Sequence, residues 1–133
     1  MKTVKNVLLG AVLLLLTSCG SITTFPISNI VPAAEITAKM KQDKNKNYSI
    51  EVKAKNLASA NRLNPPKNNY SVWIVTEKNE TKNLGQLMNK NAKTAVLKTN
   101  TPFKVIEIFI TAEDQGNNTY PSGIEISRVT LNK

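Results

Sequence analysis

Two stretches of the chain alternate apolar and polar residues with a period of two. In residues 35–42 the apolar positions are Ile36, Ala38 and Met40, and in residues 48–55 they are positions 48, 50, 52 and 54. Successive side chains of a β-strand point to opposite faces, so this period predicts two half-buried strands. The intervening sequence Asp43-Lys44-Asn45-Lys46-Asn47 is rich in turn-forming residues, which predicts that the two strands form a hairpin.

Two further segments are apolar on both faces. Residues 70–76 and 103–111 contain consecutive apolar side chains, which is typical of strands in the middle of a covered sheet. Shorter strands are predicted at 95–98 and 123–131, and a shift in apolar parity places a bulge near Ser127. No segment after residue 19 keeps a 3.6-residue period, and residues 84–88 can form one helical turn at most.

Six or seven short strands separated by loops with Asn, Pro and Gly predict an all-β fold, an antiparallel immunoglobulin-like β-sandwich. A small β-barrel is the alternative. We assign the sandwich to residues 35–133, a length suited to one modest core. Residues 19–34 contain Pro26 and Pro32 and are predicted to be a tether. A first edge strand at about residues 23–27 is the alternative for this segment.

The first 19 residues have the features of an export signal. Lys2 and Lys5 precede an apolar run over residues 7–16, and the run ends in Leu16-Thr17-Ser18-Cys19, which holds the only cysteine of the chain. The apolar run is too short for a membrane-spanning helix. The tetrapeptide resembles the bacterial lipobox. This resemblance implies that residues 1–18 are a cleaved signal peptide, that diacylglycerol is attached to the Cys19 thiol, and that the new amino terminus is acylated, for example with palmitate. A buried thiol in an ordinary signal anchor is the alternative.

The residues after Cys19 bear on the destination of such a lipoprotein. In the lipoprotein family an aspartate after the cysteine often retains the protein at the inner membrane, whereas this chain has Gly20. Some members reach the cell surface through an acidic tract after the cysteine, and residues 20–24 contain no acidic side chain. The resemblance therefore implies the outer membrane of the cell envelope, on its periplasmic side.

The mature chain is basic. Without Lys2 and Lys5 it has 16 basic and 9 acidic side chains, a net charge of +7. This charge favours anionic neighbours such as phospholipid head groups or glycolipid phosphates, and nucleic acid is not expected in this compartment.

Several motifs occur in the order found in the extracytoplasmic domain of the anti-sigma-K factor family, which the chain resembles over about residues 48–127. They are Tyr70-Ser71-Val72-Trp73-Ile74-Val75, Asn83-Leu84-Gly85-Gln86-Leu87, Phe103-Lys104-Val105, Phe109-Ile110-Thr111-Ala112-Glu113 and Pro121-Ser122-Gly123. The resemblance implies a sandwich with a sensing or interaction role. It does not extend to sigma-factor binding, because the histidine and cysteine ligands of that family's separate cytoplasmic domain have no counterpart here.

The residue types argue against catalysis. The chain has no histidine, and an acylated Cys19 cannot be a nucleophile, so we predict no catalytic residue, no metal site and no cofactor. Paired carboxylates remain the alternative, with Glu107 or Glu113 and Asp114 serving a small hydrolase or transferase. Solvated or ion-paired surface acids explain the same residues more simply.

Two surfaces are candidates for binding. The predicted hairpin places Lys39, Lys41, Lys53 and Lys55 on its outward face as a basic surface. Edge protection, in which lysines keep edge strands from pairing with other chains, is the alternative.

The second candidate is apolar. It consists of Trp73, Val75, Phe103, Val105 and Phe109 on the two central strands. These residues form either a contact face for another envelope protein or a core cluster, and tryptophan is a common core anchor of sandwiches. We therefore expect a lipid-anchored envelope protein with a non-catalytic interaction domain, and a purely structural lipoprotein is a further alternative.

Overall fold

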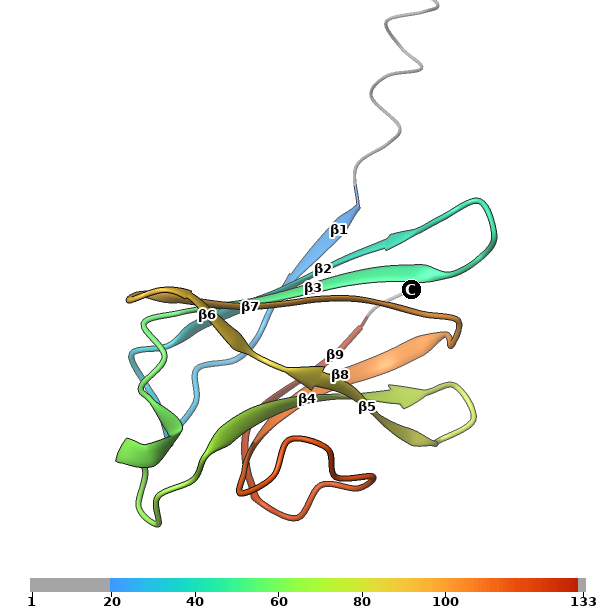
Figure 1. Ribbon diagram of the computed structural model, residues 1–133. Helices are drawn as coiled ribbons and strands as arrows, with labels where there is room; N and C mark the ends of the chain where they lie inside the picture. Colours follow the sequence, from blue (N-terminus) through green and yellow to red (C-terminus); the bar gives the residue numbers. More distant parts are fainter. Residues whose placement is uncertain (1–19, 132–133) are drawn as a thin grey trace, which may run out of the picture.

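The computed structural model describes residues 20–131 (Figure 1). The predicted signal peptide and Cys19 lie outside these residues. The strands are β1 (Ser21–Thr24), β2 (Glu35–Gln42), β3 (Tyr48–Lys55), β4 (Asn69–Thr76), β5 (Thr81–Gln86), β6 (Met88–Asn91), β7 (Thr94–Thr101), β8 (Val105–Glu113) and β9 (Ile124–Thr130). One short 3-10 helix, η2 (Ala60–Arg62), precedes β4.

The strands form two antiparallel sheets that lie face to face (Figure 1). The five-stranded sheet has the order β1-β2-β3-β7-β6, and the four-stranded sheet has the order β5-β4-β8-β9. Apart from β1, these are the orders A-B-E-D and C′-C-F-G of the immunoglobulin fold. The predicted sandwich is confirmed, and the sheets do not close into the alternative barrel.

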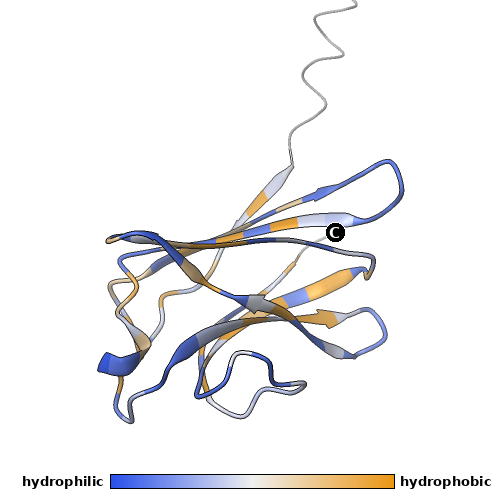
Figure 2. Cartoon of the chain, viewed as in Figure 1, coloured by the Kyte–Doolittle hydropathy of each residue, from blue (hydrophilic) through white to orange (hydrophobic). Residues whose placement is uncertain are grey.

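The strands with a clear sequence pattern form as predicted. β2 and β3 pair over their whole length, and the Asp43 Oδ1 atom accepts hydrogen bonds from the backbone N–H groups of Asn45 and Asn47 in the turn. This turn is hydrophilic throughout (Figure 2). β4 and β8 pair in the middle of the four-stranded sheet, and the predicted bulge of β9 lies next to Ser127.

The predicted number of strands was too low. Residues 20–131 contain nine strands, and the three beyond the six assigned ones, β1, β5 and β6, all lie at sheet edges. Few of their side chains face the core, and all four residues of β6 are exposed, so their sequences have no alternation to detect. Residues 84–88, predicted to form one helical turn at most, belong mainly to β5 and the start of β6.

The predicted tether is wrong over residues 20–34. β1 pairs with β2 from Ser21 to Thr24, which supports the alternative of an edge strand, two residues earlier than expected. The segment between β1 and β2 then enters the core with Phe25, Val31 and Ala34. Burial of these apolar side chains makes the segment part of the fold, so the domain begins at β1 rather than at residue 35.

The main core lies between the two sheets. Inward side chains of β2 and β3, such as Ile50 and Val52, pack with those of β4 and β8, such as Ile74 and Ile110. A smaller cluster of Trp73, Val75 and Phe109 lies apart from it. Both clusters and the nine strands of the described residues lie within residues 20–131, so a chain that begins at Gly20 contains all of them.

Candidate functional site: a cationic recess on the five-stranded sheet

The four predicted lysines point outward from the five-stranded sheet. Lys39 and Lys41 alternate on β2 with the buried Ala38, and Lys53 and Lys55 alternate on β3 with buried residues. β2 lies between β1 and β3, and β3 lies between β2 and β7. Lys39, Lys53 and Lys55 have a register partner on each neighbouring strand, so protection of a sheet edge does not explain them. Lys41 lies one residue beyond the stretch of β2 that pairs with β1.

A fifth lysine, Lys98 on β7, belongs to the same surface. The register pairs Lys98 with Glu51 of β3, and Glu51 is itself paired with Lys39 of β2. Glu51 accepts ion pairs from Lys98 at 3.5 Å and from Lys53 at 3.9 Å. Sequence reasoning missed Lys98 because the pairing of β3 with β7 joins residues 39 to 53 positions apart in the chain.

We call the outward lysines of β2, β3 and β7 the cationic face. It comprises Lys39, Lys41, Lys53, Lys55 and Lys98. The outward acids on the same strands are Glu35 and Glu51, which leaves an excess of three positive charges.

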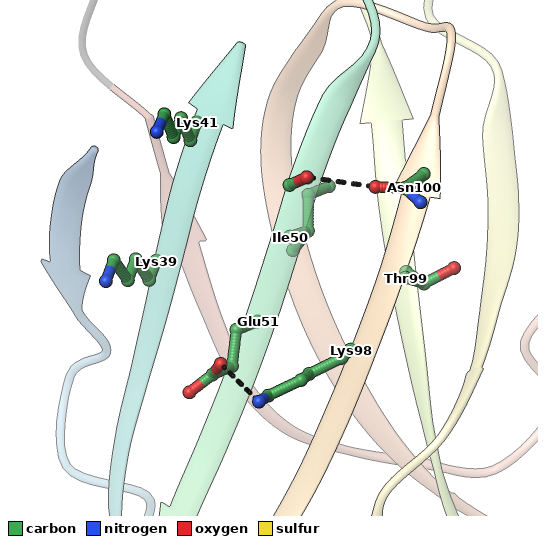
Figure 3. Close-up of a pocket in the computed structure, with 8 residues that line it drawn as sticks. Lys39, Lys41, Ile50, Glu51, Lys98, Thr99 and Asn100 are labelled. Carbon is green, nitrogen blue, oxygen red and sulfur yellow. Dashed lines mark hydrogen bonds and ion pairs between the residues drawn. The ribbon is translucent and has the colours of Figure 1, made fainter. Parts of the chain in front are cut away.

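A recess of about 320 Å³ opens on the cationic face, between β2, β3 and β7 (Figure 3). Lys39 and Lys41 bound it on β2, and Lys98 bounds it on β7. The Ser49 hydroxyl donates to Asn100 Oδ1 at 3.0 Å, so the amide nitrogen of Asn100 remains a donor at the same surface.

The recess is positively charged. Lys39 and Lys41 form no ion pair within residues 20–131, and the Lys98 charge is offset by Glu51. Its net charge is therefore +2. Its ammonium and amide groups are hydrogen-bond donors that can bind an anion.

The start of the described chain lies next to this recess. A Cβ atom on Gly20 would lie 2.8 Å from the Met40 carbonyl oxygen and 3.2 Å from the Lys41 Cβ atom. The first distance is shorter than real Cβ atoms show, so only glycine fits here without a shift of the backbone. The chain therefore enters the fold beside Lys41.

The predicted apolar contact face is divided among three places. Trp73, Val75 and Phe109 form the smaller buried cluster, Val105 belongs to the main core, and Phe103 is 41% exposed beneath the Lys82 Nζ atom. These five residues do not form one surface, because inward and outward side chains alternate along each strand.

A loop covers Trp73 from outside. The indole ring is fully buried, lies 6.2 Å from the Phe109 ring and donates from Nε1 to Thr111 Oγ1 at 2.8 Å. The loop from β8 to β9 reaches β5, where Asn83 Nδ2 donates to two of its carbonyl groups, and β4 lies between β5 and β8. This loop lies beneath the four-stranded sheet (Figure 1). The core interpretation therefore holds for Trp73 and Phe109.

Glu113 anchors the ends of this loop. Its side chain is fully buried, and it accepts hydrogen bonds from the Thr111 hydroxyl, the Ser122 hydroxyl and the Gly123 backbone N–H at 2.5, 2.9 and 3.1 Å. Burial by itself raises the pKa of Glu113, but these hydrogen bonds together hold the pKa below its ordinary value.

The candidate catalytic acids do not form a pair. Glu107 accepts an ion pair from Arg128 at 3.3 Å, and Asp114 accepts one from Lys67 at 3.3 Å, as expected for surface acids. Glu113 differs, because it is a buried structural group. Glu107 and Glu113 are six residues apart on one strand, about 20 Å, whereas the carboxylates of glycosidases lie about 5 to 9.5 Å apart.

Other functional features were sought in the same part of the chain. Residues 20–131 contain no group of three or more Asp, Glu, His or Cys side chains that could hold a metal ion. Over the same range no helix has the length and apolar character needed to cross a membrane. No family model, no curated protein and no solved structure matches the chain.

Proposed function

We propose that this chain is a lipid-anchored protein of the cell envelope. In this proposal its β-sandwich is a non-catalytic interaction domain that lays its cationic face on the anionic surface of the membrane that holds it. The proposed location is the outer membrane, on its periplasmic side.

One observation supports this proposal above others: five outward lysines gather on one face, and Lys39, Lys53 and Lys55 lie where their strands are paired on both sides. Charges on interior strands are not needed to block strand pairing, and an excess of three positive charges on one face attracts anionic groups. Each lysine near an anionic bilayer contributes about 1 kcal/mol, and this attraction weakens with added salt.

The lipid anchor makes this weak attraction sufficient to keep the cationic face on the membrane surface. Two or three acyl chains, each at about 0.8 kcal/mol per buried methylene, hold a small domain on the bilayer. Gly20, directly after Cys19, lies against β2, so no long linker separates the lipid from the sheet. The cationic face then acts at high local concentration and needs little affinity of its own.

The anchor is tested with Cys19→Ser in cells supplied with an acyl-chain analogue. We expect loss of acyl labelling and loss of partition into detergent, because only the thiol accepts diacylglycerol. The unchanged chain serves as the positive control. Partition of the mutant into detergent at the unchanged level would refute the anchor.

The cationic face is tested with the soluble chain 20–133 and vesicles that contain anionic phospholipid at low salt. Changing Lys39, Lys41, Lys53 and Lys55 to glutamine is expected to remove most binding. The matched control removes four charges elsewhere: Arg62, Lys78, Lys82 and Lys104 are changed to glutamine. Equal losses in the two variants would show that net charge alone acts, and the proposal that this face docks would be abandoned.

A further inference from the structure

The recess and the chain start bring together two features that general charge attraction does not require. The first is a set of donor side chains from three strands that border one recess, Lys39 and Lys41 of β2 with Lys98 and Asn100 of β7; the Lys39 and Lys41 side chains extend away from β3, and Lys98 reaches to Glu51 (Figure 3). The second is the position of Gly20 beside Lys41, one residue after the proposed lipid attachment. Consecutive Cα atoms are about 3.8 Å apart, so an anchored chain holds the recess close to the membrane surface.

We propose that the recess binds the phosphate monoester head group of a lipid in the membrane that holds the protein. This inference rests on the proposed function and names the chemical group that the cationic face selects. The charge fits, because a phosphate monoester carries about −1.5 to −2 near neutral pH and the recess carries +2. A phosphodiester carries one negative charge and would leave one lysine without a partner.

The size of the recess also fits a head group. Its volume of about 320 Å³ is at the lower end of the range for small-molecule sites, which run from about 300 to 1,000 Å³. Glu51 on the wall of the recess already neutralises Lys98, so Lys39 and Lys41 supply the two positive charges that are left to bind a ligand.

An exposed apolar side chain lies next to the recess on the anchor side. Ile22 of β1 is the register partner of Lys39, and directly paired residues of neighbouring strands share a face. Ile22 is 68% exposed. An apolar side chain beside a phosphate site matches the boundary between the head groups and the acyl chains of a bilayer, whereas a free phosphorylated sugar offers it no apolar partner.

The experiment compares two double variants of the chain 20–133 that each lose two charges from the same face. Lys39→Gln with Lys41→Gln alters the recess, and Lys53→Gln with Lys55→Gln does not. Binding is measured by co-sedimentation with phosphatidylcholine vesicles that contain either phosphatidate or phosphatidylglycerol, adjusted to equal surface charge. Circular dichroism verifies that both variants keep the fold.

We expect the unchanged chain to prefer phosphatidate. The recess variant should lose about 30-fold in affinity for phosphatidate and lose the preference, since two lysines at about 1 kcal/mol each correspond to that factor. The other variant should weaken binding to both vesicles and keep the preference. Equal effects of the two variants, or no preference in the unchanged chain, would overturn the recess as a site while binding to both vesicles still upheld the proposed function. Absence of binding to either vesicle would overturn both.

Two single changes separate the phosphate contact from the lipid contact. Asn100→Ala leaves the charge unchanged and should lower affinity for phosphatidate two- to tenfold through loss of a hydrogen-bond donor. Ile22→Ser should weaken binding to phosphatidate vesicles but not the binding of inorganic phosphate, followed through the amide signals of Ser49. If Ile22→Ser leaves vesicle binding unchanged, a free phosphorylated compound rather than a lipid is the ligand, and the lipid assignment is wrong.

Discussion

Replacement of Glu113 by glutamine tests how the outer loop of the four-stranded sheet is held. Glu113 is a fully buried acceptor for side-chain and backbone donors at both ends of the segment that covers Trp73. Glutamine has nearly the same size, so Glu113→Gln changes the charge and the hydrogen bonds without leaving a cavity. Two of the donors, the N–H groups of Ser122 and Gly123, belong to the backbone and cannot be turned away.

The cost follows from counting these donors. Whichever way the new amide is turned, its NH₂ group faces a donor. In place of Oε2 it leaves the Gly123 N–H without an acceptor, at a cost of about 1 to 3 kcal/mol, and in place of Oε1 it opposes the Asn118 amide nitrogen while the Ser122 N–H keeps its bond to Oε2. The remaining hydrogen bonds lose the contribution of the negative charge, which roughly halves their strength. We expect Glu113→Gln to lower the free energy of unfolding by about 3 kcal/mol.

Urea unfolding of the chain 20–133 provides the measurement, because Trp73 is the only tryptophan of the chain and reports on the loop that covers it. Glu107→Gln is the matched control. It is the same chemical change on the same strand and face, but Glu107 is partly exposed and forms a surface ion pair with Arg128, so a loss of at most about 1 kcal/mol is expected. If Glu113→Gln costs no more than Glu107→Gln, the loop is not held by the buried carboxylate.

The pH dependence provides a second measurement of the same interaction. The pKa of Glu113 in the folded state lies below its ordinary value of 4.5, so the carboxylate stabilises the fold above that pH. The stabilisation is lost as the pH falls below 4.5 and through the folded-state pKa. The difference in stability between the unchanged chain and Glu113→Gln should therefore shrink on acidification, and a constant difference would contradict this explanation.

Three further experiments test other parts of the fold. Trp73→Ala should lower the free energy of unfolding by about 3 to 5 kcal/mol, and Phe103→Ala, at an exposed position, by less than about 1 kcal/mol; urea unfolding followed by circular dichroism compares them. Gly20→Val should disrupt the pairing of β1 with β2, because the valine side chain would meet the Met40 carbonyl oxygen. Hydrogen exchange of the β1 amides should be faster in Gly20→Val than in Gly20→Ala, since the larger side chain forces a larger shift of the backbone. Burial raises the pKa of Tyr70 to about 12, so one tyrosine should ionise late in an alkaline absorbance titration, and Tyr70→Phe should remove that late step.

Interior strands could be predicted from the sequence because their side chains meet a core on at least one face. The alternation of Ile50 and Val52 with polar residues predicted β3 with its correct bounds. A run of residues around Ile74 that is apolar on both faces predicted β4. Edge strands lack this signal. The sequence of β6 contains no buried residue, and β1 reads as a polar linker although Phe25 beyond it is buried.

The cationic face could be predicted in part for the same reason. Once the hairpin was assigned, the alternation of inward and outward side chains along each strand placed Lys39 and Lys53 on the outward face. Lys98 and the recess depend on which distant strand pairs with β3, and that choice is a tertiary one. The role of Glu113 was also hidden, because its donors come from a loop ten residues further along the chain and from a threonine that looks like any other strand residue.

The position of β1 has a mechanical consequence for a chain held at Cys19 as proposed. Any pull between the lipid and the domain enters at Gly20 and loads the hydrogen bonds from β1 to β2 before the rest of the sandwich. β1 is bonded on one side only and is four residues long, so it is expected to detach first. Its release would free about 17 Å of chain up to Phe25, whose burial is the next point of resistance. Under tension the domain would thus move a short distance further from its lipid anchor while the rest of the sandwich stays folded, and renewed pairing of β1 with β2 would reverse this extension.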